Sequence, residues 1–311
     1  MSLITDSFLA TFHSISFEKI TDHPNILIAA RFWDDERYES ARTCYKFMRA
    51  IDDLIDNNKT NHRIISDREK QLFNDEVEKW INSICNSLNA HPAQRELMDT
   101  VEKFRIPLWP MKVFARSMIY DIYHDGFPTL QAFLDYSEGA TVAPASIFVH
   151  LCCLTKQNGL YHEPEFDLKK IATPCALFSY FVHIIRDFEK DQRNNLNYFA
   201  DDLVAKHGLD RAELKKIALG GDLPQGFRDL VQAYYVLADG YRIKTRAVIQ
   251  EIAPMLEPRY RLSLEIIFNL YLMVFERIDV VSGTFRTAEL TPTPNEIRER
   301  VYDTIMNFKT V

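Results

Sequence analysis

The chain is poor in the features that mark several large classes of protein. It has nine glycines in 311 residues and few stretches that alternate apolar with polar residues, which argues against a sheet protein. Its net charge of -7 gives no basic surface that could follow a phosphate backbone, so nucleic acid is not expected as a partner. Its five cysteines form no CxxC motif and lie in apolar text, as reduced thiols do, which favours a cytoplasmic location.

Long hydrophobic runs are also missing. The longest uncharged run, 139–155, is shorter than the roughly 20 residues that cross a bilayer. The N-terminus lacks the basic and apolar regions of a signal peptide. We therefore expect a soluble protein and leave peripheral membrane contact open. No GxGxxG dinucleotide motif occurs, which leaves the use of NADPH open as well.

Helical periodicity is present almost everywhere. Apolar residues recur every three or four positions, which predicts an all-α fold, and no linker divides 1–311, which predicts a single domain. Asp67 and Thr129 are expected N-caps, and Gly208 is an expected helix stop. No strand is predicted. The expected helices are 24–33, 36–56, 67–89, 92–105, 108–124, 129–157, 166–192, 200–217, 225–253, 257–283 and 293–308.

Four of these segments are apolar over most of their circumference, which predicts a helical bundle with a buried central layer around an apolar cavity. They are 36–56, 129–157, 166–192 and 257–283.

Two acidic pairs lie inside this apolar text. Asp52 and Asp56 are four residues apart, and so are Asp187 and Asp191. Positions i and i+4 share one face of a helix, so each pair directs two repelling carboxylates the same way. A cation would remove that repulsion. Carboxylate oxygens are ligands that Mg²⁺ prefers where it also binds substrate phosphates, so the pairs predict a metal-bridged diphosphate site.

Cations accompany both pairs. Arg49 lies three residues before Asp52, and Arg186 immediately precedes Asp187. Metal and guanidinium groups together stabilise a departing diphosphate, which fits ionisation of an allylic diphosphate. The 21 Phe and 14 Tyr could line a dry cavity for the resulting carbocation. The alternative is that the acids are ordinary solvated positions. The sequence does not decide whether Asp53 is a third metal ligand or a solvated neighbour of the pair.

These segments resemble the squalene and phytoene synthase family, whose members join two isoprenoid diphosphates head to head in an all-helical fold with Mg²⁺. The likeness spans most of the chain. Besides the two acidic motifs, it includes Phe104–Pro107, Met118–Asp121, Leu134–Gly139, Pro258–Arg261 and Glu276–Ile278.

The resemblance assigns roles to individual residues. Asp52, Asp56, Asp187 and Asp191 would match the metal-binding acids, with Mn²⁺ as an alternative to Mg²⁺, and Arg49 and Arg186 would hold diphosphates. Tyr136 would lie near the reacting centre. Further residues that would contact substrate are Asp121, Tyr198 and Tyr271.

The chain also departs from the family pattern. At the start of the first helix, His23-Pro-Asn25 stands closer to a variant of the hopanoid-type squalene synthases, which makes Asn25 a substrate-binding candidate. His183 replaces the Asn that opens the second motif and is, at that position, a further substrate-binding candidate. Leu196 stands where an Arg is expected, with Arg193 nearby. These changes put the second half-reaction, rearrangement of a cyclopropyl intermediate, in question.

The expected function is a Mg²⁺-dependent prenyltransferase acting on farnesyl or geranylgeranyl diphosphate. Its product would be of the squalene or phytoene type, or the cyclopropyl or hydroxylated intermediate. One alternative is a terpene synthase or diphosphatase that uses a single prenyl diphosphate. A further alternative is a non-catalytic isoprenoid-binding protein. Substrate length and oligomeric state are open.

Overall fold

The computed structural model describes residues 3–19, 25–60, 66–86 and 92–309, without the side chains of 3, 54–60, 83–86 and 92–94. The helices are α1 Leu3–His13, η1 Phe17–Lys19, α2 Asn25–Ala30, α3 Asp35–Thr60, α4 Asp67–Asn86, α5 Pro92–Lys103, α6 Trp109–Tyr123, α7 Leu130–Ser137, η2 Glu138–Val142, α8 Ala143–Cys153, α9 Leu168–Arg193, α10 Asp201–Lys206, α11 Arg211–Ala218, α12 Gln225–Ile252, η3 Ala253–Met255, α13 Pro258–Phe275, α14 Thr287–Leu290 and α15 Pro294–Asn307. Two short strands, β1 Thr155–Gln157 and β2 Leu160–His162, complete the described part.

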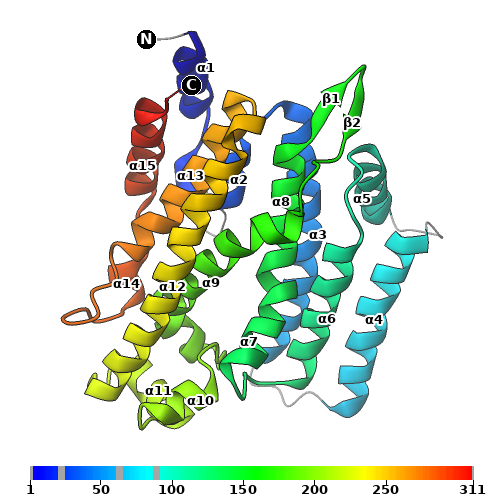
Figure 1. The fold of residues 1–311 in the computed structure, drawn as a ribbon. Helices are drawn as coiled ribbons and strands as arrows, with labels where there is room; N and C mark the ends of the chain where they lie inside the picture. Colours follow the sequence, from blue (N-terminus) through cyan, green and yellow to red (C-terminus); the bar gives the residue numbers. More distant parts are fainter. Residues whose placement is uncertain (1–2, 20–24, 61–65, 87–91, 310–311) are drawn as a thin grey trace.

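Helix α9 is the centre of the all-α bundle (Figure 1). It packs against α8 on one side and against α12 and α13 on the other. Helices α3 and α6 cover the far side of α8, α4 and α5 lie outside them, and α15 with α1 lies outside α13. By length and composition α9 could cross a membrane, but 61% of its apolar window is buried, as in a core helix. The expected central layer is therefore present, with α9 at its middle.

The predicted helix 129–157 is wrong in two places. A π-helical turn, η2, separates α7 from α8. Pro144 in the first turn of α8 has no N–H to donate to the carbonyl of Ala140, which favours a break here. Gly139 lies so close to α6 that a Cβ would come within 2.2 Å of the Val113 carbonyl oxygen. Only glycine permits this approach between the two helices.

The end of that segment is a β-hairpin, contrary to the expectation of no strands. Thr155 pairs with His162 and Gln157 with Leu160. The turn between them is Asn158-Gly159, with φ of 51° and 81°. An Asn-Gly pair with two positive φ values is the preferred two-residue hairpin turn. The Asn-Gly dipeptide therefore indicated a hairpin, but the helix-like spacing of the apolar residues before it favoured a helix.

Other boundaries vary in accuracy. Thr129 caps α7 by accepting a hydrogen bond from the Ala132 amide, as expected. Gly208, with φ of 71°, ends α10, so predicted helix 200–217 becomes α10 and α11. Asp67 is not the cap of α4, because the Ser66 hydroxyl accepts from the Glu69 amide at 3.3 Å. The predicted helix 257–283 corresponds to α13, which ends earlier, at Phe275. Helix α1 has no counterpart among the predicted helices.

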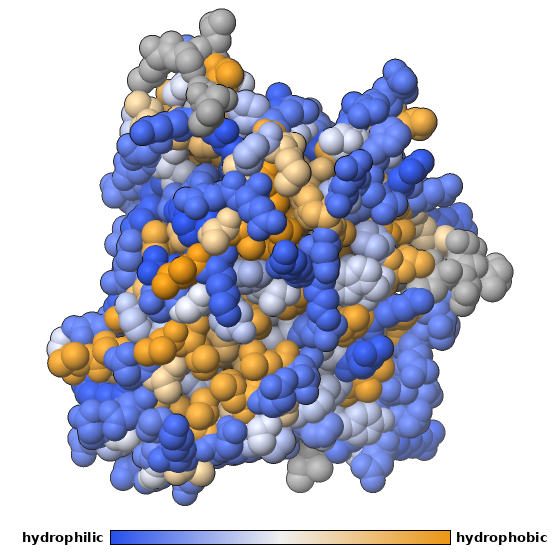
Figure 2. Space-filling view, viewed as in Figure 1, coloured by the Kyte–Doolittle hydropathy of each residue, from blue (hydrophilic) through white to orange (hydrophobic). Residues whose placement is uncertain are grey.

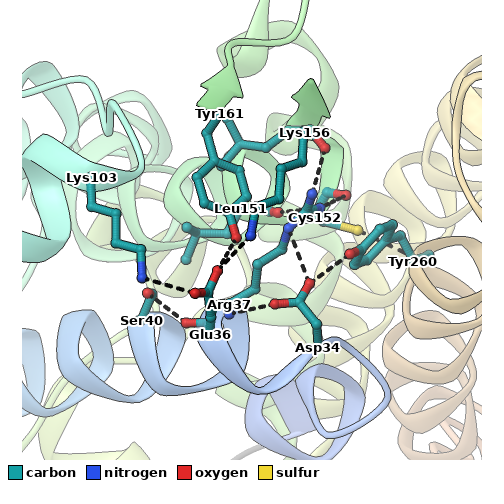
Figure 3. Close-up of polar contacts among 11 residues, drawn as sticks. Asp34, Glu36, Arg37, Ser40, Lys103, Leu151, Cys152, Lys156, Tyr161 and Tyr260 are labelled. Carbon is teal, nitrogen blue, oxygen red and sulfur yellow. Dashed lines mark hydrogen bonds and ion pairs between the residues drawn. The ribbon is translucent and has the colours of Figure 1, made fainter. Parts of the chain in front are cut away.

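A buried arginine fixes the start of α3 (Figure 3). Arg37, only 2% exposed, donates to the carbonyl oxygens of Leu151 and Leu154 at 3.2 and 2.9 Å. These carbonyls end α8, where helix geometry leaves them without partners. Asp34 lies 3.4 Å from Arg37 and accepts a hydrogen bond from the Tyr260 hydroxyl of α13 at 2.7 Å. The network ties α3 to α8 and α13.

The surface is mostly hydrophilic on the face shown in Figure 2, with hydrophobic residues gathered in its lower part over the α9 and α12 region. Val236 and Ile243 on α12 are 58% and 57% exposed. They are two helical turns apart and thus share one face.

Candidate active site

A cavity of about 990 Å³ lies among α3, α8, α9 and α13. Helix α9 contributes residues spaced by three or four positions, so a single stripe faces the cavity. Near its start the stripe is small or apolar, and near its end it is charged. Its members are Ile171, Cys175, Ala176, Ser179, His183, Arg186, Asp187 and Lys190.

The charged end of the cavity meets solvent. Lys190 lines the cavity and is also exposed, which places it at the mouth. Across from α9, helix α3 contributes Arg49 and Asp53 to the same lining. The rest of the wall is largely apolar and comes mainly from α8 and α13, with further residues from α2, α3, α12 and α15. The cavity therefore has a polar mouth and a hydrocarbon-lined interior.

On α3, one arginine serves two carboxylates. Arg49 contacts Asp52 at 3.0 Å and Asp53 at 2.5 Å. All three side chains are between 36% and 46% exposed. Asp53 lines the cavity, whereas Asp52 is outside the described lining. Asp53 thus faces the cavity while remaining partly exposed, and its role as a third metal ligand stays a prediction.

On α9, arginine and aspartate form a fork. Arg186 donates through Nε and Nη2 to the two carboxylate oxygens of Asp187, each at 2.7 Å. Their side chains are 21% and 25% exposed. Burial acts to raise the pKa of Asp187, but the Arg186 guanidinium outweighs it and holds that pKa below its usual value. Asp187 is therefore ionised at neutral pH.

Carboxylates of α3 and α9 both lie close enough to Tyr180 to act on its phenol. The pKa of Tyr180 is raised well above its usual value by burial and by the charges of Asp121, Asp52 and Asp191. Because Asp52 is on α3 and Asp191 on α9, both helices bring a carboxylate near one phenol. Tyr180 was not among the predicted site residues. Its position seven residues before Asp187 places it on the same helix face and could have indicated it.

Tyr136 lies in the same polar layer. Its hydroxyl donates to Asp121 at 2.5 Å, and burial together with the Asp121 charge raises its pKa. The phenol is thus protonated and held in place. The Ser117 hydroxyl supports it by donating to the Tyr136 carbonyl at 2.7 Å.

Three further candidates line the main cavity: Asn25, His183 and Tyr271. The His183 and Tyr271 rings meet edge to face at 5.2 Å. Burial and the nearby Arg186 charge lower the pKa of His183 to about 3, so its imidazole is neutral. Burial raises the pKa of Tyr271, which keeps its phenol protonated.

Tyr198 and Asp121 instead border a separate hollow of about 10 Å³. Tyr198 stacks on Phe127 with ring centroids 6.4 Å apart. Arg193, the neighbour considered as a substitute for the missing arginine, pairs with Glu189 at 2.9 Å. The side chain of Asp56 lies outside the described residues, so its place in the site stays a prediction.

The carboxylates are suited to a hard divalent cation by their chemistry. Within the described ranges no group of three or more His, Cys, Asp or Glu side chains is already gathered for a metal. Asp52 and Asp187 are each held by an arginine instead. Carboxylate oxygens on α3 and α9, which border one cavity, nevertheless fit Mg²⁺, whose remaining ligands would come from phosphate or water.

Comparison with known proteins decides the family. The family model described as squalene/phytoene synthase matches residues 23–294. The chain belongs to this family. The squalene/phytoene synthase family comprises prenyltransferases that bind prenyl diphosphates and typically use Mg²⁺. No curated protein matches the chain.

Solved structures share the fold. The squalene synthase HpnC of Alicyclobacillus acidocaldarius superimposes with a TM-score of 0.65 at 14% identity, covering 89% of this chain and 94% of its own. A dehydrosqualene synthase in complex with ligand gives 0.64 at 15% identity, covering 94% and 97%. YisP of Bacillus subtilis gives 0.56 at 14% identity, covering 97% and 98%. At these identities the likeness concerns the fold.

Proposed function

We propose that this squalene/phytoene synthase family member condenses two prenyl diphosphates, farnesyl or geranylgeranyl, head to head and releases diphosphate. The observation that carries the proposal is one apolar cavity whose mouth bears Arg-Asp pairs from two helices, α3 and α9. Its volume of about 990 Å³ is at the upper end of ordinary ligand sites, about 300–1,000 Å³, which leaves room for long hydrocarbon chains.

The chain's own residues have distinct tasks in this proposal. Arg49 and Arg186 bind phosphate oxygens and offset the charge that develops on the leaving group. The apolar walls on α8 and α13 exclude water that would quench a cation, and Tyr136 holds its proton at Asp121. Asp52, Asp56, Asp187 and Asp191 would hold Mg²⁺, which when bound supplies further charge neutralisation of the diphosphate.

A second candidate is a single-substrate reaction, favoured by His183. Its neutral imidazole faces the cavity beside Arg186 and forms no hydrogen bond with any described side chain or backbone group. Such a group could orient water toward a cation. The two candidates differ in product mass, because coupling doubles the carbon number and hydrolysis or cyclisation does not.

One experiment tests both candidates. Purified protein is incubated with each prenyl diphosphate and Mg²⁺, with and without NADPH, and extracted products are analysed by mass spectrometry while pyrophosphate is assayed. A doubled carbon skeleton supports condensation, and an unchanged skeleton supports the second candidate. Pyrophosphate release that is absent with both substrates rejects catalysis and leaves an isoprenoid-binding protein. Release that combined Asp52→Asn and Asp187→Asn leaves unchanged rejects catalysis at this site.

We also propose that the protein works in the cytoplasm with peripheral membrane contact, because a hydrocarbon product needs an apolar destination. Val236 and Ile243 offer exposed apolar surface on one face of α12. Sedimentation with phospholipid vesicles should bring down wild-type protein and less of a Val236→Ser, Ile243→Ser variant. Equal sedimentation of the two proteins rejects this contact surface.

A further inference from the structure

The cations at the cavity mouth differ in whether they contact a carboxylate. Arg49, Arg186 and Lys190 line the cavity, together with the carboxylates Asp53 and Asp187. Each carboxylate is matched by an arginine, Asp53 by Arg49 at 2.5 Å and Asp187 by Arg186 at 2.7 Å. Within the described part of the chain, the side chain of Lys190 forms neither an ion pair nor a hydrogen bond, and its backbone carbonyl accepts one from the Asn194 amide. Among the described cations of the lining, Lys190 is therefore the one without a direct carboxylate contact, although its charge still acts on Asp187.

The position of Lys190 is specific. It follows Arg186 by four residues, so both cations project from one face of α9, and both belong to the cavity-facing stripe. Like charges at this spacing cost a few tenths of a kcal/mol on a helix. An anion that bridges them would turn this repulsion into attraction. Phosphate oxygens accept several charged hydrogen bonds at once and suit such a pair.

The other lining cations are less available. Arg49 and Arg186 must loosen a contact with a carboxylate before they turn fully to a ligand, whereas Lys190 gives up no such contact. Lys190 is also exposed, so an approaching anion meets it before the half-buried fork. The charge of Lys190 should therefore raise both the association rate and the affinity of an anionic ligand.

We propose that Lys190, with Arg186, binds the terminal phosphate of a prenyl diphosphate independently of metal. This inference rests on the proposed function and adds to it a residue outside both acidic pairs. The ligand lies with its diphosphate at the mouth and its hydrocarbon chain among the apolar walls. The hold orients the substrate and contributes affinity that survives removal of divalent cations.

Calorimetric titrations test the proposal with inorganic pyrophosphate and with farnesyl thiodiphosphate, each in EDTA and in Mg²⁺. The variants are Lys190→Gln, Lys190→Arg and the control Lys206→Gln, an exposed lysine on α10 outside the cavity lining. In EDTA, Lys190→Gln should weaken binding of both ligands about tenfold, the loss expected for one charged hydrogen bond. Lys190→Arg should recover most of it, and Lys206→Gln should match wild type.

The outcomes separate the two proposals. Wild-type protein that binds neither ligand in EDTA but binds both in Mg²⁺, or Lys190→Gln that binds like wild type in EDTA, overturns the metal-independent hold. Wild-type protein that binds neither ligand even with Mg²⁺ overturns the proposed function instead. Circular dichroism melting of each variant distinguishes weakened binding from unfolding, and an exposed lysine should change the melting temperature little.

Discussion

The two acid-bearing helix ends solve the same charge problem differently. At the end of α3, Arg49 divides its guanidinium between two carboxylates that are 36% and 46% exposed. At the end of α9, Arg186 gives a two-point fork to Asp187, which is 25% exposed. Charged contacts are stronger when less solvated, and forked contacts fix orientation. The α9 end is therefore the more rigid half of the site, and the α3 end the more adaptable.

The largest expected effect comes from breaking the α9 fork. Asp187→Asn should reduce pyrophosphate release at least about a hundredfold, because it removes a carboxylate that would hold Mg²⁺ and that orients the Arg186 guanidinium, the two groups that neutralise the leaving group. It should also lower the free energy of urea unfolding by about 1–3 kcal/mol, since Arg186 loses its charged partner. Asp52→Asn should lose turnover too, but with a stability change under about 1 kcal/mol. Equal stability losses would contradict the contrast between the helix ends.

Substitutions of Arg186 and Arg49 test the same difference between α9 and α3 through ligand affinity. Arg186→Gln should weaken binding of farnesyl thiodiphosphate in Mg²⁺ about tenfold or more, through loss of a charged hydrogen bond at a half-buried position. Arg49→Gln should have a smaller effect, because that guanidinium is 40% exposed and its contacts are screened. Calorimetry on both variants gives the comparison, and a larger loss for Arg49→Gln would reverse the assignment.

Acid should affect the α9 end through His183. Its pKa is about 3 in the folded protein against 6.5 for an unperturbed histidine, because it is buried and faces the Arg186 charge. Between these values the unfolded chain binds the extra proton, so stability from neutral His183 is complete above pH 6.5 and declines as the pH falls toward 3.

Urea unfolding at several pH values measures this decline. From about pH 7 to about pH 5.5, wild-type protein should lose about 1 kcal/mol more stability than His183→Asn. Asp187, whose pKa is lowered, remains ionised over this range and does not contribute to the difference. Parallel curves for the two proteins would show that His183 is not held neutral by its surroundings.

The smallest expected effect is at the exposed α3 pair. Asp53→Asn should change the free energy of unfolding by less than about 1 kcal/mol at low salt, and by less still at 1 M NaCl, where screening acts within roughly 3 Å. Unfolding in urea at both salt concentrations tests this. A salt-independent loss of several kcal/mol would mean that Asp53 is as tightly engaged as Asp187.

Much of the fold follows from sequence because helical periodicity is local. Predicted segments 225–253 and 293–308 correspond to α12 and α15 within one residue at each end. The failures occur where helical periodicity competes with another determinant, a tertiary contact at Gly139 and a local turn signal at Asn158-Gly159. The close approach of α6 at Gly139 accompanies a π-helical turn inside apolar text, and the Asn158-Gly159 turn makes a hairpin of residues with helix-like spacing.

The site was predictable in kind but not in arrangement. The motif spacing placed Arg186 and Asp187 on an apolar helix as parts of a diphosphate site, and both residues line the cavity. Spacing could not show that Asp53 lines the cavity where Asp52 does not, or that Lys190 stands at the mouth. These outcomes depend on how each helix is rotated about its axis.

The sequence by itself determined that this protein is a helical bundle of the squalene/phytoene synthase family with acidic pairs on two apolar helices, because side-chain periodicity and motif spacing are properties of the chain alone. Only the tertiary structure decided which charges share the cavity. Contacts between distant segments, such as Arg37 with the end of α8 and Asp34 with α13, tie α3 in place against its neighbours. The rotation of α3 and α9 depends on such contacts, and a rotation of one residue, 100° on a helix, exchanges the side chain that faces the ligand.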